Sequence, residues 1–198
     1  MPYRLTPRML QELRNDLKRY HGLFTGGRCG AWELEELITR AINSDNNTQH
    51  HARWNEGGHD DNADIEVRIN GRKVGIQVKS GKVNTRNETL TISGHRLGRF
   101  DKNLHAISDY LNERTVDIIS VSYNQINNDQ GRQHEYTVRY IEIDRLAGVF
   151  PERWEQHGRQ WRQENDYGVL LSLRPSMSWQ VWWEIPLIQT EQVSHFIL

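Results

Sequence analysis

Three side chains in the first half of the chain, Asp64, Gln77 and Lys79, bring together a carboxylate, an amide and an amine. Carboxylate and amide oxygens are ligands for hard cations, and an ammonium group offsets negative charge that develops during a reaction. These residue types therefore favour chemistry on an anionic substrate, provided that the fold places them side by side.

A hairpin over residues 63–79 is the element expected to place them. Apolar residues alternate through 63–69 and 74–78, with the period of two that is typical of half-buried strands. Asn70-Gly71 lies between the two runs and predicts a two-residue type I′ turn. A turn there pairs residues whose numbers sum to 141, which sets Asp64 opposite Gln77, with Lys79 two residues further along the same face.

This arrangement resembles the PD-(D/E)xK nuclease superfamily, which has the restriction-endonuclease-like fold. An acid near the start of one hairpin strand is followed in the next strand by an acid or amide, any residue, and lysine, here Gln77-Val78-Lys79. No proline precedes Asp64, and glutamine replaces the second acid. Glutamine at that position resembles the Mrr-type restriction branch.

The resemblance implies an α/β fold with a mixed central sheet flanked by helices, and a Mg²⁺-dependent endonuclease that makes double-strand breaks in DNA as a type II-like restriction or defence enzyme. Asp64, Gln77 and the backbone carbonyl of Val78 would bind Mg²⁺, with Mn²⁺ as a substitute, because both metals take oxygen ligands. Lys79 would position the attacking water. A catalytically degenerate DNA-binding protein of the same fold is the alternative, and an unrelated interaction module with these residues on a solvated face is a further one.

Glu33 is a fourth candidate catalytic residue. The string Gly30-Ala31-Trp32-Glu33 resembles the start of the first core helix of Mrr-like nucleases, where the glutamate reaches the metal site. A solvated helix glutamate is the alternative reading. Asp60 and Asp61, in a polar segment over residues 43–62 that is expected to be a loop, are reserve ligands.

Charge suggests where DNA would bind. The chain as a whole has a net charge of −1. The segment from Glu66 to His105, however, contains nine lysines and arginines and only three acids, a local surplus of six positive charges. Basic residues there suit phosphate contact, with solvated surface charge as the alternative. The expected DNA-binding residues are Lys82, Arg86, His95, Arg96 and Arg99.

Composition bounds the location of the protein. The single cysteine, Cys29, excludes an internal disulfide and suits a reducing cytoplasm. Charged residues interrupt the N-terminus, so no signal peptide is expected, and no apolar run approaches the roughly 20 residues of a membrane span. A soluble cytoplasmic protein is expected.

The remaining pattern predicts one domain over residues 1–198, with helices at 6–20 and 31–42, a third strand at 88–93 and a helix at 101–112. Further strands are expected at 116–123 and 136–143, separated by a polar loop, and an antiparallel pair at 169–173 and 179–185. A homodimer is expected because two copies cut two strands of a symmetric site most simply. Its candidate contact comprises Trp154, Trp161, Trp182 and Trp183.

Overall fold

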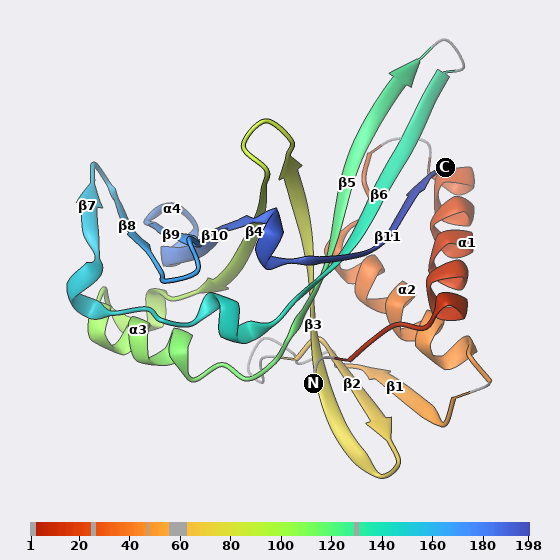
Figure 1. Ribbon diagram of the computed structural model, residues 1–198, viewed down its shortest axis with the longest axis horizontal. Coiled ribbons are helices and arrows are strands. Elements are labelled where there is room, and N and C mark those ends of the chain that lie inside the picture. Colours follow the sequence, from red (N-terminus) through yellow and green to blue (C-terminus); the bar gives the residue numbers. More distant parts are fainter. Residues whose placement is uncertain (1–2, 25–26, 47, 56–62, 129–130) are drawn as a thin grey trace. The chain divides into compact units, whose positions relative to one another are not determined.

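The computed structural model describes residues 3–24, 27–46, 48–55, 63–128 and 131–198 (Figure 1). These residues form helices and a large mixed sheet of eleven strands, which confirms the α/β class. They divide into two compact units, where sequence predicts one domain. Unit 1 is drawn from the segments Met1–Ser80, Val116–Tyr140 and Gln192–Leu198, and unit 2 from Gly81–Thr115 and Ile141–Glu191.

Unit 1 contains two long helices and six strands among its described residues. They are α1 (Pro7–Leu23), α2 (Ala31–Ser44), β1 (His50–Trp54), β2 (Ile65–Ile69), the first part of β3 (Arg72–Asn84), β5 (Ile118–Asn128), β6 (Gly131–Ile141) and β11 (Glu191–Ile197). The strand order is β1-β2-β3-β5-β6-β11. Figure 1 shows β3 and β5 running in the same direction, and this parallel neighbour makes the sheet mixed.

The two helices begin where the sequence predicts and run slightly longer. The Thr6 hydroxyl accepts a hydrogen bond from Met9 N at 3.2 Å, and Pro7 occupies the first helical position. Apolar side chains from both helices form one core with β2, β3, β5 and β6, and its members include Leu13, Leu17, Leu34, Ile38, Ile65, Val67, Ile76, Val78, Ile119 and Val138. The stripe of leucines therefore fixes both helices on the sheet.

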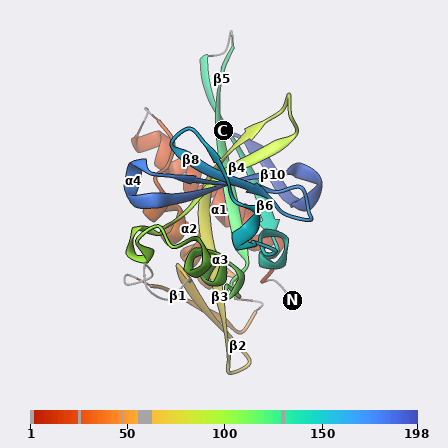
Figure 2. The same ribbon diagram turned by 90° about the vertical axis from the view of Figure 1, so that its left-hand side faces the viewer.

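Two segments of unit 1 differ from the prediction. Residues 50–54, expected to be loop, form β1 and pair with β2 in an antiparallel register that runs from His50↔Ile69 to Trp54↔Ile65. The polar segment from Asn124 to His134, also expected to be loop, belongs instead to β5 and β6 over its described residues. Figures 1 and 2 show the hairpins β2–β3 and β5–β6 reaching opposite ends of unit 1.

Unit 2 is an antiparallel sheet with one longer helix packed on it. Its strand order is the last part of β3, then β4 (Thr89–Arg96), β10 (Gln180–Pro186), β9 (Leu170–Arg174), β8 (Gln160–Glu164) and β7 (Glu155–His157). The helices are α3 (Leu104–Asn112) and the single turn α4 (Ser176–Trp179), and the 3₁₀ segments are η1 (Gly98–Phe100), η2 (Ile143–Leu146), η3 (Pro151–Arg153) and η4 (Leu187–Gln189). The antiparallel pair predicted at 169–173 and 179–185 is confirmed as β9 and β10.

Tryptophan packing organises unit 2. Trp183 is 1% exposed, and Trp154 is 6% exposed with its indole N–H donating to Ser108 Oγ at 3.0 Å. That bond explains why Ser108 is completely buried on the apolar face of α3. Among the described residues, no helix is long and apolar enough to cross a membrane.

Candidate active site

The hairpin that carries the site forms as the sequence predicts. Asn70 and Gly71 have φ of 48° and 79°, the positive values that a type I′ turn requires. The register runs from Ile69↔Arg72 to Ile65↔Ile76, so the paired numbers sum to 141. Val67 and Val74, with Ile65 and Ile76, therefore meet on one face as expected.

The expected pair Asp64↔Gln77 does not form, because β2 starts at Ile65 and the ladder ends there. In a two-residue hairpin the hydrogen-bonded pairs recur every second residue, so Val78 N would meet the carbonyl of Ala63. Val78 N instead donates to Asp64 Oδ2 at 2.8 Å. Asp64 N donates to Ile76 O at 2.9 Å, while the Ala63 carbonyl accepts from Asn55 Nδ2 at 3.2 Å. The carboxylate thus replaces a backbone carbonyl at the end of the strand.

The structure does bring Asp64 and Lys79 together. Lys79 Nζ lies 3.4 Å from Asp64 Oδ2, and the two side chains are 19% and 13% exposed. Charge-assisted N–H···O bonds are usually 2.7–2.9 Å long, so this contact is loose. Both charged groups of this ion pair are therefore partly exposed.

Val78 contributes on the same side. In a strand, the N–H and C=O of one residue point to the same neighbour, so the Val78 carbonyl faces the side where Asp64 accepts its N–H. Gln77 N donates to Asp117 O of the segment entering β5, at 3.0 Å. The Gln77 side chain is 1% exposed and lies on the face of β3 opposite Ile76 and Val78. Asp64 is therefore a partly exposed candidate ligand, whereas Val78 and Gln77, at 2% and 1% exposed, are buried candidates.

Glu33 lies at the beginning of its own helix. A Cβ built on Gly30 would stand 2.2 Å from Glu33 Oε2, so the carboxylate folds back over the residue that caps α2. Carboxylates at the third helical position are stabilised there by the N-terminal N–H groups and the helix dipole. Its negative charge also contributes to raising the pKa of Cys29, after burial, to about 12. These contacts hold Glu33 at the beginning of α2, and the metal role that the resemblance implies stays a prediction.

Glu35 is a buried acid of α2. Its side chain is 8% exposed, and Oε2 accepts from Trp54 Nε1 at 2.9 Å, which ties α2 to β1. This bond could not be predicted from the sequence, because Trp54 belongs to β1, a strand that the sequence pattern does not predict.

The donor set fits a hard cation through oxygen atoms, with one carboxylate. Among the described residues there is no group of three or more His, Cys, Asp or Glu side chains placed to hold a metal ion. Asp60 and Asp61 lie outside the described residues. Asp64 and the Val78 carbonyl are the two oxygens on one side of the hairpin end, and both are ligand types that Mg²⁺ accepts.

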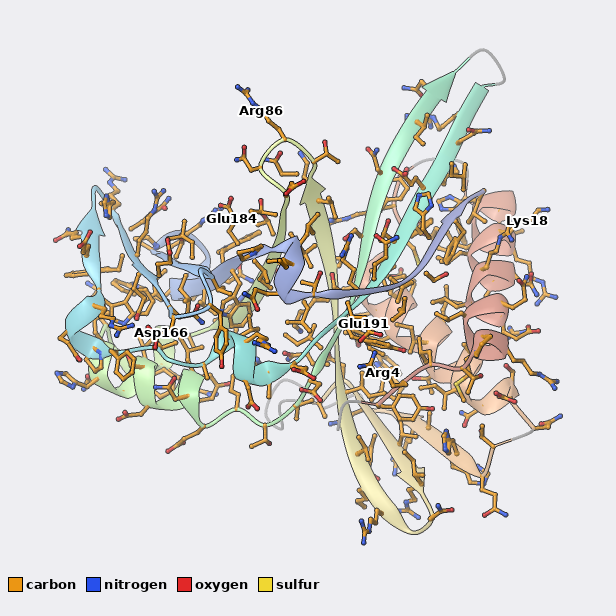
Figure 3. The ribbon with its side chains drawn as sticks, viewed as in Figure 1. Arg4, Lys18, Arg86, Asp166, Glu184 and Glu191 are labelled. Carbon is orange, nitrogen blue, oxygen red and sulfur yellow. The ribbon has the colours of Figure 1, made fainter. Side chains whose placement is uncertain are left out.

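All five expected DNA-binding residues belong to unit 2 or to the part of β3 that enters it. Lys82 pairs with Thr91 across β3 and β4, and Arg86 is exposed in the turn between those strands, where Figure 3 shows it pointing away from them. The Arg99 guanidinium lies 4.8 Å from the ring centroid of Tyr110, whose ring also meets His95 edge-on. Arg96 is exposed at the end of β4.

A buried pair of histidines went unnoticed in the sequence. The rings of His21 on α1 and His134 on β6 stack with centroids 3.5 Å apart. His21 Nε2 is 2.7 Å from the Tyr136 hydroxyl, and His134 Nδ1 is 3.0 Å from the Tyr123 hydroxyl. Burial, and then the charge of His134, lowers the pKa of His21, and burial followed by the charge of Arg132 lowers that of His134.

Comparison of the chain with protein-family models, with curated proteins and with solved structures gave no match.

Proposed function

We propose that the protein is a Mg²⁺-dependent endonuclease that hydrolyses phosphodiester bonds of double-stranded DNA, and that it belongs to the PD-(D/E)xK superfamily as a restriction or defence enzyme. One observation carries the proposal: at the end of the hairpin the partly exposed Asp64 carboxylate accepts from Val78 N and lies 3.4 Å from the partly exposed Lys79 ammonium. The order of elements along the chain also supports it. Two helices are followed by the hairpin, a strand, a helix and two further strands, as the sequence predicts, and β1 is an addition to that series.

The chemistry assigns a separate task to each group. A bound Mg²⁺ would withdraw charge from the phosphate and make its bound water more acidic. Asp64 and the Val78 carbonyl would hold that ion, with Gln77 supplying an amide oxygen from the interior. Lys79, whose ammonium lies 3.4 Å from Asp64 Oδ2, would position the attacking water and offset the charge of the transition state.

Cleavage of supercoiled plasmid and genomic DNA in Mg²⁺ and in EDTA tests the proposal. Asp64→Ala and Lys79→Ala are expected to abolish metal-dependent cleavage. Glu66 and Lys73 provide a matched control, because they form an ion pair of 2.9 Å across the two strands of the same hairpin. Glu66→Ala and Lys73→Ala should cut at the wild-type rate. Equal cutting by Asp64→Ala and Glu66→Ala would reject the assignment.

A DNA-binding protein that does not cleave is the second candidate, and the position of Glu33 favours it. With that carboxylate at the start of α2 and Gln77 uncharged, Asp64 supplies the only negative charge among the proposed ligands. This candidate predicts a stable protein–DNA complex, with plasmid left intact in Mg²⁺ and in Mn²⁺. Appearance of linear product in either metal would exclude it.

A further inference from the structure

Several arginines of unit 2 lie over aromatic rings, and acids neutralise only some of them. The Arg153 guanidinium lies 4.5 Å from the Phe150 ring centroid and pairs with Asp166 at 2.8 Å. The Arg174 guanidinium likewise lies 4.5 Å from the Trp182 ring centroid. Within the described part of the chain, it makes no ion pair or hydrogen bond. Arg174 is thus held in place by an aromatic ring, with its charge available.

The strand register places two further arginines near Arg174. Gln180 of β10 pairs with Arg96 on one side and with Arg174 on the other, so these three residues form a row across β4, β10 and β9. The neighbouring row contains Ser93, Trp182, Ser172 and Arg162. Side chains of one row share a face of the sheet. Val181 and Trp183 point to the opposite face and are buried in the core of unit 2.

We call Arg96, Arg162, Arg174 and Trp182 the arginine–tryptophan face. Trp182 and Arg174 are half-buried, whereas Arg96 and Arg162 are exposed. Among the described residues no acid pairs with any of the three arginines, and Arg162 donates only to Gln160 Oε1, at 3.3 Å. The face therefore carries three positive charges around one indole ring.

The acids of this sheet surface lie beside the face. Glu184 and Glu164 belong to the next row, which also contains Lys82, and Glu184 accepts from Thr89 Oγ1 at 3.2 Å. Figure 3 labels Glu184. Glu155 is the cross-strand partner of Arg162 in register, but its carboxylate lies 3.3 Å from His157 Nε2. Negative charge thus borders the two arginine rows on one side and at the β7 edge.

We propose that the arginine–tryptophan face binds single-stranded DNA. Adjacent strands lie about 4.8 Å apart, so Arg96 and Arg174, two strands apart, stand about 10 Å from each other at the backbone. That separation lets long arginine side chains contact different phosphates of one strand. A base can stack on the Trp182 ring, or on the Arg174 guanidinium that lies over it, only after it has left the duplex, which makes the ligand single-stranded.

This binding activity goes beyond the proposed nuclease and uses none of Asp64, Val78 or Lys79. Binding needs no metal, so it is measured in EDTA, where cleavage cannot occur. Asp64→Ala is expected to bind as the wild-type protein does. If the protein does not cleave DNA, the face can still bind single-stranded DNA. If the face does not bind single-stranded DNA, the nuclease proposal is unaffected.

The test is fluorescence anisotropy of a labelled oligothymidine of about 20 nucleotides, longer than the usual site on one such surface. Trp182→Ala should weaken binding about tenfold, the effect of losing one base stack, while Trp182→Phe, which keeps a ring, should lose much less. Thermal unfolding of both variants separates a binding defect from a folding defect, and Trp182→Phe provides the test if the alanine variant is unstable.

Salt dependence tests the arginines independently. Between about 50 and 200 mM salt, the slope of log K against log salt should become shallower by about 0.7 in Arg174→Ala and in Arg162→Ala, one released counterion for each phosphate contact. Arg153→Ala is the matched control, because its guanidinium also stacks on a ring but is neutralised by Asp166, and its slope should stay that of the wild type.

Two results would overturn the proposal. One is equal affinity for the oligothymidine and for a duplex of the same length, which would mean that no unstacked base is recognised. The other is unchanged affinity and slope in a folded variant that combines Arg162→Ala, Arg174→Ala and Trp182→Phe.

Discussion

The Asp64 carboxylate serves both the fold and the proposed chemistry. Its Oδ2 accepts the Val78 N–H that would otherwise meet a backbone carbonyl, and the same atom faces the Lys79 ammonium. Removing the side chain therefore removes a hydrogen-bond acceptor as well as a charge, and one substitution cannot separate the two.

A pair of substitutions separates them. Asp64→Asn keeps an oxygen that can accept from Val78 N, so its stability should stay near that of the wild type while Mg²⁺-dependent cleavage is lost. Asp64→Ala leaves that N–H without its partner and should also cost about 1 kcal/mol in the free energy of unfolding. Urea unfolding and plasmid cleavage measure the two effects. Cleavage at the wild-type rate by Asp64→Asn would show that no charge is needed at this position.

Gln77 offers a test from the interior. Because its side chain is 1% exposed, Gln77→Glu buries a carboxyl group and should lower the melting temperature in EDTA. If residue 77 is a metal ligand, Mg²⁺ should restore much of that loss by binding the folded state. Gln77→Met, similar in size and uncharged, should show no such Mg²⁺ effect. Equal responses of both variants to Mg²⁺ would argue against ligation by residue 77.

The turn chemistry explains why so much of this site could be predicted from the sequence. Asn70-Gly71 fixes the register through local backbone preferences, and that register carries Val78 and Lys79 to the right place. The displacement of Asp64 could not be predicted in this way. It depends on Asn55, the residue that follows β1, whose side chain donates a hydrogen bond to the Ala63 carbonyl.

At the scale of elements, β1 shows how a strand can form without an apolar pattern. Its sequence is His-His-Ala-Arg-Trp, and every residue in it is exposed or half-buried. The strand is held by pairing with β2 and, on its other edge, by Asn43. That side chain donates to Ala52 O at 2.9 Å and accepts from Ala52 N at 2.8 Å, as a neighbouring strand would. Such support from a helix terminus leaves no periodic signal in the sequence.

Gly94 gives an element-scale prediction about unit 2. The strand predicted from the sequence ends at residue 93, but Gly94 lies within β4, where a Cβ would stand 2.2 Å from the Trp183 ring. Gly94→Ala should therefore destabilise unit 2 by about 1–3 kcal/mol, because a packed indole must move. Trp183→Leu should cost less in the Gly94→Ala background than alone, since the smaller side chain relieves the clash. Additive losses in this double-mutant cycle, measured by urea unfolding, would contradict the packing argument.

At the scale of the whole molecule, the division into two units escapes sequence analysis because the chain enters unit 2 twice, through Gly81–Thr115 and Ile141–Glu191. No linker of distinct composition marks these crossings. The homodimer stays a prediction, and its candidate contact needs revision. Trp154 and Trp183 are buried inside unit 2, so only Trp161 and Trp182 of the four proposed residues reach the surface.

Light scattering on the free protein and on a DNA complex tests the homodimer. Two copies in the complex are expected if one metal site cuts each strand of a symmetric sequence. Trp161→Ala should weaken a dimer whose contact includes Trp161, whereas Arg159→Ala, an exposed neighbour just before β8, serves as the control for a nonspecific surface effect. A monomer in both states that releases nicked plasmid would reject the dimer and leave the nuclease proposal in place.

The stacked histidines predict how stability responds to acid. The pKa values of His21 and His134 are lowered in the folded protein, first by burial. The unfolded chain therefore binds more protons as the pH falls below the ordinary histidine value of about 6.5, and the free energy of unfolding should decrease from there downward. Each unit of lowered pKa is worth about 1.4 kcal/mol at the low end of this range. Urea unfolding from about pH 7.5 to about pH 5, a range that spans that value, measures the loss. His134→Gln removes one titrating ring and the repulsion between the two, so its stability should depend less on pH than that of the wild type. His157→Gln, at an exposed position in β7, should retain the wild-type dependence. A wild-type profile that is flat across this range would show that the stacked rings accept protons without cost.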